Sequence, residues 1–301
     1  NLLEAQLSKA NLINSRLVRA NLSGADLSEA TSLGADFGNA NLHKALLGET
    51  YLVQAKLQDV DLSEAYLENA HLMSADLSKA NLSQARLRGA HLREACFGSA
   101  NLNEADLSHT DCIGADFRKA NLNHVNLIRA GLNRANFNNA NLCGAYLNSA
   151  DLSESNLIEA DLSYSNLDQV NFSSADLSGS NLFGSSLHGV NFNKANISDA
   201  DLNESDLTNA NLVSTTISNA KLSNSKIYGI NVWDLEGEFK EQKDLIVTPE
   251  DQPVITVDNI KVAQFIYLLL NNQEIRDAIN TLTSKTVLIL GRFAIPERKV
   301  I

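Results

Sequence analysis

Carboxylate and amide side chains recur at a fixed spacing along this chain of 301 residues. Taken every fifth residue from Asn1 to Asn231, 30 of the 47 positions are Asp or Asn. Paired carboxylates can serve as a general acid and a general base, but that chemistry requires a cleft and two unequal environments. The regular array predicts instead that each of these side chains accepts hydrogen bonds from the backbone of its own turn.

Two histidines and an aspartate follow the same regularity, because His71, His91 and Asp111 are each 20 residues apart. Two imidazoles and a carboxylate form a ligand set that zinc accepts. On a convex wall, however, neighbouring side chains diverge, and no second group is evident that would orient the imidazoles. We therefore expect no metal site here.

Other catalytic signatures are missing from the sequence. It contains no Gly-rich phosphate loop, no CxxC pair and no Ser-His-Asp constellation. Cys96, Cys112 and Cys143 are spaced neither as a disulfide framework nor as a zinc site, which predicts a reducing, cytoplasmic location. No run of 18 or more apolar residues is present, so we expect no membrane span. These 301 residues predict neither a cofactor nor enzymatic activity.

The element that positions these side chains is a five-residue apolar repeat. From Leu2 to Val232, 35 of 47 positions taken every fifth residue are Leu. All the others are Phe, Ile or Val, except Ser32 and Cys112. The position two residues earlier is Ala in 31 of 46 cases. The unit therefore reads Ala-(Asp/Asn)-Leu-x-x.

A period of five fits neither regular secondary structure. On an α-helix a five-residue step rotates each Leu by about 140°, so no apolar stripe forms. On a flat strand successive Leu side chains point to opposite faces. A chain that bends once per repeat and closes into stacked coils can direct every Leu to a common axis, which predicts a solenoid.

Six phenylalanines at central positions indicate how many repeats form one coil. These phenylalanines fall into two groups, and within each group the residue numbers differ by multiples of 20. The residue numbers of Ser32 and Cys112 also differ by a multiple of 20. Four repeats per coil would stack like residues in columns and give a buried core ladder. The two groups are Phe37, Phe97, Phe117 and Phe137, and Phe172 and Phe192.

Residues 1 to about 231 resemble the pentapeptide-repeat family, because their units agree in phase throughout. The resemblance implies an all-β fold, a right-handed quadrilateral parallel β-helix with four pentapeptides per coil. That corresponds to eleven to twelve coils over residues 1–232. At roughly 4.8 Å between stacked strands the rod would be about 55 Å long.

The remaining residues lose the repeat. We expect residues 233–258 to form an acidic linker or a cap over the last coil, with Trp233 as a buried cap residue. Residues 259–301 predict a small, mostly α-helical extension of two helices and one strand. Asn271 and Glu274 look like the capping pair of the second helix, and Thr286 to Leu290 read as a buried strand.

This extension resembles the junction at which some pentapeptide-repeat proteins continue into a Toll/interleukin-receptor-like or nucleotide-binding α/β domain. The segments that carry the resemblance are Lys261–Leu270 and Val287–Arg298. It implies a further signalling or effector domain beyond Ile301. One Gly after a strand is not by itself a phosphate-binding motif.

Outward positions of a rod in water are expected to be polar, yet one wall is apolar in its N-terminal half. A strip of this kind predicts contact with a protein partner or with a second copy of the chain. Scattered, ordinary exposure is the alternative explanation, and a local shift turning Leu33 inward would shorten the strip. We call the following eight residues, which are separated within each column by multiples of 20, the contact stripe: Ile13, Leu33, Val53, Met73, Ile113, Tyr51, His71 and His91.

The chain carries 36 acidic residues and 24 Lys and Arg, a net charge of −12. Direct binding to nucleic acid or to an anionic membrane is therefore disfavoured. Three functions remain. The first is a non-enzymatic interaction scaffold. The second is an acidic DNA mimic, since some quinolone-resistance pentapeptide-repeat proteins that bind DNA gyrase are similar acidic rods. The third is an effector enzyme whose catalytic domain lies beyond residue 301.

Overall fold

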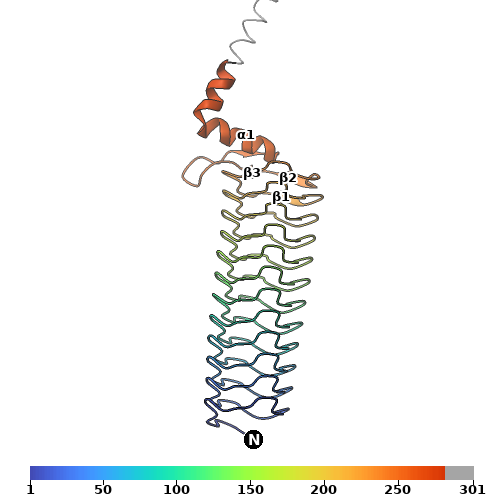
Figure 1. The fold of residues 1–301 in the computed structure, drawn as a ribbon. Helices are drawn as coiled ribbons and strands as arrows, with labels where there is room; N and C mark the ends of the chain where they lie inside the picture. The colour runs from blue at the N-terminus through green and yellow to red at the C-terminus, as the bar shows by residue number, and fades with distance from the viewer. Residues whose placement is uncertain (282–301) are drawn as a thin grey trace, which may run out of the picture.

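The chain winds into a rod of stacked coils, drawn from bottom to top in Figure 1. The computed structural model describes residues 1–281. Each coil takes 20 residues, because parallel bridges join every fifth residue to the residue 20 positions later, from Gln6–Asp26 to Lys226–Ile246. Four five-residue repeats therefore make one turn of the rod, as the spacing of the phenylalanines predicts.

A tight turn at each repeat bends the chain round a corner. In the repeat at Leu27 the Ala30 N–H donates to the Leu27 carbonyl at 3.0 Å. Glu29, between them, has φ +57°, the left-handed conformation that the third position of a type II turn requires. The Asp26 carboxylate accepts the Ser28 N–H at 2.9 Å. The recurring Asp or Asn thus stabilises its own corner, as predicted from the regularity of the array.

Backbone hydrogen bonds tie each coil to the next. The Leu27 N–H donates to the Leu46 carbonyl at 2.7 Å, and the Leu46 N–H donates back to the Ala25 carbonyl at 2.9 Å. A third bond joins the Glu29 N–H to the Gly48 carbonyl at 2.9 Å. The same three bonds recur in nearly every repeat, so the rod satisfies its backbone by stacking.

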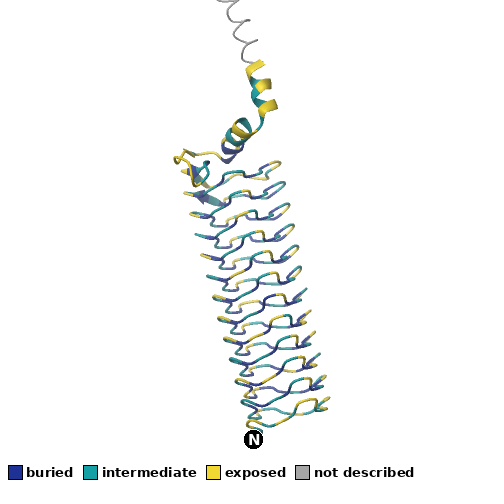
Figure 2. Ribbon diagram, turned by 90° about the vertical axis from the view of Figure 1, so that its left-hand side faces the viewer, coloured by how far each residue is buried: buried dark blue, intermediate teal, exposed yellow. Residues whose placement is uncertain are grey.

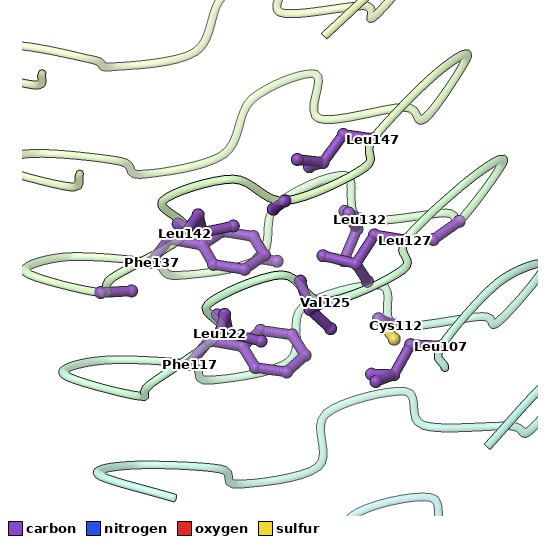
Figure 3. Packing of buried hydrophobic residues seen from close by; sticks show 14 of the residues in the cluster. Leu107, Cys112, Phe117, Leu122, Val125, Leu127, Leu132, Phe137, Leu142 and Leu147 are labelled. Atoms are coloured by element: carbon purple, nitrogen blue, oxygen red, sulfur yellow. The ribbon is translucent and has the colours of Figure 1, made fainter. Parts of the chain in front are cut away.

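The core is a continuous cylinder of the central Leu or Phe side chains and the Ala side chains beside them. Figure 2 shows the buried positions alternating with exposed ones round every coil above the first. Figure 3 shows Phe117 and Phe137 stacked among Leu122, Val125 and Leu142. Phe97, Phe117 and Phe137 stack with centroids 4.8 Å apart, and Phe172 and Phe192 at 5.3 Å. All six phenylalanines, Phe37 included, are fully buried.

The two breaks in the repeat keep their core positions. Ser32 is fully buried and its hydroxyl has no hydrogen-bond partner, while Leu33 remains 37% exposed. The inward turn of Leu33 considered above is therefore wrong, because the backbone pairing holds Ser32 in register. Cys112 fills its slot as a buried thiol that donates to Thr110 Oγ1 at 3.3 Å. Burial raises the pKa of the Cys112 thiol to about 12.

Stacking continues beyond residue 232 into the range expected as a linker or cap. Strand β1 (Lys221–Ser223) pairs in parallel with β2 (Glu241–Lys243), and Lys226 bridges Ile246. Strand β3 (Leu245–Ile246) then pairs antiparallel with β4 (Thr256–Val257). The irregular residues thus form part of one more coil and a short hairpin above it.

Helix α1 (Ile260–Asn271) closes the upper end of the rod (Figure 1). The Asn259 side chain caps it by accepting the N–H groups of Lys261 and Val262. Ile260 and Ala263 face the last coil and are buried. Trp233, by contrast, is 57% exposed, so its expected burial as a cap residue is wrong. The helix covers only part of the coil end and leaves the indole at its side.

A second helical segment follows at residues 273–281. Its N-cap is Asn272, whose side-chain oxygen accepts the Ile275 N–H at 3.1 Å. The assignment of this role to Asn271 is wrong by one residue, because Asn271 is still the last residue of α1 and donates to the Tyr267 carbonyl. The strand expected at Thr286 to Leu290 lies outside the described residues. Within residues 1–281 no helix is long and apolar enough to cross a membrane.

Stacked rings give a test of the core. We expect Phe117→Leu to lower the free energy of unfolding by about 1–3 kcal/mol more than Phe37→Leu does. Both substitutions remove the same atoms, but Phe117 loses two ring stacks worth about 0.5–1.5 kcal/mol each, and Phe37 stacks on no ring within residues 1–281. Urea denaturation followed by circular dichroism measures the difference, and equal losses would show that stacking adds nothing to burial.

Candidate protein-contact surface

The contact stripe lies on one wall of the rod in two parallel columns. The aliphatic column consists of Ile13, Leu33, Val53, Met73 and Ile113 in successive coils, with Arg93 in the place before the last. Ile13 is 46% exposed and Met73 42%, and Val53 and Ile113 are half-buried. Their spacing follows directly from the bridges between coils, so the structure aligns in one column residues up to 100 positions apart in the sequence.

The aromatic column runs beside it. The rings of Tyr51 and His71 stack face to face, with centroids 4.5 Å apart and planes 1° from parallel. His71 and His91 stack at 4.8 Å and 14°. Tyr51 is 45% exposed, so the column presents an aromatic edge to solvent. Stacking of this kind holds the three side chains in one conformation and lowers the entropy that a partner would have to remove.

Asp111 ends the aromatic column in an ion pair. Its carboxylate accepts a hydrogen bond from Arg93 Nε at 2.5 Å. The Arg93 guanidinium thus binds the carboxylate that could have served, with the two histidines, as a metal ligand. Among residues 1–281 no three His, Cys, Asp or Glu side chains are placed to hold a metal ion.

The pKa of His71 lies below its ordinary value of 6.5. Burial is the main cause, because it disfavours the charged imidazolium. The neighbouring His91 acts in the same direction, and the carboxylate of Glu49 acts against both. The centre of the stripe is consequently uncharged near neutral pH.

The C-terminal half of the same wall has a different character. In the column that carries Tyr51 and His71, each Asn amide donates to the side-chain oxygen of the residue one coil earlier, at 2.9–3.1 Å. These polar groups satisfy one another and form an amide ladder. This ladder was not predicted from the sequence, although its spacing of 20 is visible in Asp151, Asn171, Asn191, Asn211 and Asn231.

Several arginines of the middle coils contact nearby acidic or aromatic groups. Arg118 pairs with Asp116 at 2.7 Å, and Arg134 pairs with Glu154 at 2.9 Å. The Arg86 guanidinium lies 4.8 Å from the centre of the Tyr66 ring, a cation–π contact. These contacts hold three of the cations against groups on the same or a neighbouring coil.

A concave site at the upper end of the rod was also missed. A groove of about 410 Å³ lies between the last coil and α1. The side-chain oxygen of the buried Gln264 is oriented toward the Trp233 indole and accepts a hydrogen bond from its Nε1 at 2.9 Å. The Gln264 side-chain nitrogen donates a hydrogen bond to the Val232 carbonyl at 3.0 Å. Trp233 and Phe265 are both exposed beside the groove. Its signal in the sequence was the single Trp at the end of the repeat.

Comparison with protein families identifies the repeat. A model of the pentapeptide repeats matches overlapping segments of the chain between residues 5 and 229. The chain belongs to the pentapeptide repeat family. Its rod is therefore a right-handed β-helix, as the resemblance of the Ala-(Asp/Asn)-Leu-x-x unit implied. No curated protein sequence is similar enough to the chain to count as a relative.

Several solved pentapeptide repeat structures are similar to this chain. HetL, involved in heterocyst differentiation regulation in the cyanobacterium Nostoc sp. strain PCC 7120, is 28% identical over 80% of this chain and 92% of its own, with a TM-score of 0.37. QnrB1, a plasmid-mediated fluoroquinolone resistance protein, is 20% identical over 62% and 91%, with a TM-score of 0.43. A protein from the thylakoid lumen of Arabidopsis thaliana is 34% identical over 36% and 68%, with a TM-score of 0.24. The family assignment rests on the repeat match.

The stacked histidines give a pH-dependent prediction. A lowered pKa means that the unfolded chain binds this proton more readily than the folded chain. The stability contributed by neutral His71 is thus complete above pH 6.5 and is lost as the pH falls toward the lower folded-state pKa. We expect the NMR titration of His71 to have its midpoint below 6.5 and His91→Asn to raise that midpoint part of the way back. A midpoint at or above 6.5 would contradict the burial and stacking of this ring.

Proposed function

We propose that this pentapeptide repeat protein is a non-enzymatic scaffold that binds a protein partner through the contact stripe. The observation that carries the proposal is the contrast along one wall. Its N-terminal half exposes aliphatic and aromatic side chains, whereas its C-terminal half satisfies its polar groups in the amide ladder and is apolar only at Val213 and Trp233, near the end of the rod. A rod that needed only solubility would have no reason to differ between the two halves.

The composition of the stripe supports a contact with protein. Tyr and Met are enriched at the centres of protein interfaces, where charged side chains are depleted. Tyr51 and Met73 occupy neighbouring coils near the middle of the stripe, and both are exposed. His71 beside them is neutral near pH 7 because its pKa is lowered. The centre of the stripe can therefore be dehydrated without burying a charge.

The surroundings of the charged residues support a role without catalysis. Asp and Asn side chains accept hydrogen bonds from their own turns, and Arg93, Arg118 and Arg134 pair with carboxylates. Groups held in this way are spread over a convex surface instead of converging on one reacting atom. We also propose a reducing, cytoplasmic location, which agrees with the three free thiols Cys96, Cys112 and Cys143.

Two matched double variants test the scaffold. In Val53→Asp/Met73→Asp, carboxylates replace the centre of the aliphatic column. In the control, Ser153→Asp/Ser173→Asp, they enter the equivalent positions of the amide-ladder half. We expect the first variant to lose, and the control to retain, the proteins captured from an extract of the source cells. Both variants should keep the circular dichroism spectrum of the unchanged protein.

Equal capture by the two double variants would reject the stripe as the contact. Loss of capture by both would also reject it, because a general increase in negative charge would then explain the effect. The comparison is independent of the partner's identity, since capture is measured as the set of proteins retained by the unchanged chain.

A second function is favoured by the net charge of −12. An acidic rod of this family can act as a DNA mimic on a topoisomerase such as DNA gyrase. The arginines of the middle coils argue against it, because Arg86 and Arg118 interrupt the acidic surface. We expect no inhibition of gyrase supercoiling by micromolar protein, measured on relaxed plasmid. Inhibition would establish the mimic in place of the scaffold.

A further inference from the structure

We infer that the contact stripe binds an amphipathic α-helix whose apolar face is flanked by Lys or Arg, lying along the axis of the rod. The inference rests on the proposed function and names the kind of segment that the stripe accepts. Three features of the stripe lead to it, namely the spacing of its rungs, the state of its backbone and the charges at its edges.

The spacing of the rungs matches a helix better than a strand. The rings of the aromatic column repeat every 4.5–4.8 Å along the rod. A helix presents one face every turn, about 5.4 Å, so four rungs accumulate a mismatch of roughly 2–3 Å. Side chains on one face of a strand repeat every ~6.8 Å, and four rungs accumulate roughly 8 Å. Only the helix stays in register over the length of the stripe.

The width of the stripe also suits a helix. The aromatic and aliphatic columns are two residues apart within a coil, as in Tyr51 and Val53, and are separated by an inward Leu such as Leu52. Two residues of extended chain span roughly 6–7 Å. An α-helix with its side chains is about 10–12 Å across and its apolar face covers roughly 100° or more, so one such face can contact both columns at once.

The backbone of this wall leaves no edge to which a strand could add. The Leu52 N–H donates to the His71 carbonyl at 2.7 Å, and the His71 N–H donates to the Thr50 carbonyl at 2.9 Å. The Gln54 N–H donates to the Met73 carbonyl at 3.0 Å. Strand addition requires free main-chain donors and acceptors, and these are already used between the coils. A partner must therefore bind through side chains, as a helix does.

Carboxylates lie on both sides of the stripe centre. Glu49 is exposed beside the aromatic column, close enough to His71 to affect its pKa. Glu94 lies on the aliphatic side, where it accepts a hydrogen bond from Ser74 at 3.4 Å. Neither carboxylate belongs to an ion pair among residues 1–281, whereas Arg93, the cation within the stripe, already pairs with Asp111. The edges thus favour a helix with basic flanks.

Three synthetic peptides of 18 residues test the inference by fluorescence anisotropy with the full chain. The first is an amphipathic helix with Leu at i, i+3, i+4 and i+7 and Lys beside this face. The second replaces these Lys residues by Glu, and the third has the composition of the first in strict apolar–polar alternation. We expect the first peptide to bind at least about tenfold more tightly than the others, a difference of about 1.4 kcal/mol.

Variants of the protein then locate the binding. Val53→Asp/Met73→Asp should abolish binding of the first peptide, and Ser153→Asp/Ser173→Asp should leave it unchanged. Glu49→Lys/Glu94→Lys should remove the preference for Lys over Glu flanks while the protein stays folded by circular dichroism. Equal binding of the alternating peptide, or binding that Val53→Asp/Met73→Asp does not reduce, would overturn the helix.

The outcome is distinguishable from failure of the scaffold itself. If capture from extract depends on Val53 and Met73 but the first peptide does not bind, the scaffold stands and the helical partner is wrong. If the first peptide binds the stripe with the stated preferences, the recognition is established for this surface even before the natural partner is known.

Discussion

The hydrogen bonds between coils are the constraint on which the rest of this structure depends. Each repeat directs its backbone N–H and C=O groups along the rod, as the bonds between Leu27, Leu46 and Ala25 illustrate. This arrangement fixes a 20-residue register, so a side chain at any position lies above the one 20 residues earlier. Burial of the Leu and Ala side chains then supplies the hydrophobic free energy, and the register decides which residues share it.

Columns are the consequence of that register, and they explain the surface. A stack of rings forms where aromatic residues recur, inside the rod at Phe97, Phe117 and Phe137 and outside it at Tyr51, His71 and His91. A ladder of amides forms where Asn recurs in the same outer column. One wall therefore changes from apolar to mostly self-satisfied polar without any change in its backbone, and becomes apolar again at Val213 and Trp233. Function in such a rod depends on which side chains recur.

The upper end of the rod is held together by tertiary packing instead of by the repeat. There the repeat is lost, yet residues as far as Ile246 still pair with the coil beneath them. Helix α1 covers the core with Ile260 and Ala263 and leaves Trp233 exposed beside a groove. Capping a solenoid requires only that its last apolar layer be shielded from water, so the cap is shaped by tertiary packing and not by a local repeat.

The sequence by itself determined the parts that a local rule repeats. The five-residue period assigned Leu and Ala to the core, the spacing of the phenylalanines indicated four repeats per coil, and the Asp or Asn before each Leu indicated its bond to the turn. The tertiary structure alone decided how the chain packs at the end of the repeat and which side chains from different coils are in contact. The exposure of Trp233, the Arg93–Asp111 pair and the amide ladder all depend on contacts between coils or at the rod's end. The physical reason is that every five-residue repeat carries the residues that set its own conformation. Each of these contacts, in contrast, forms only after the coils have stacked.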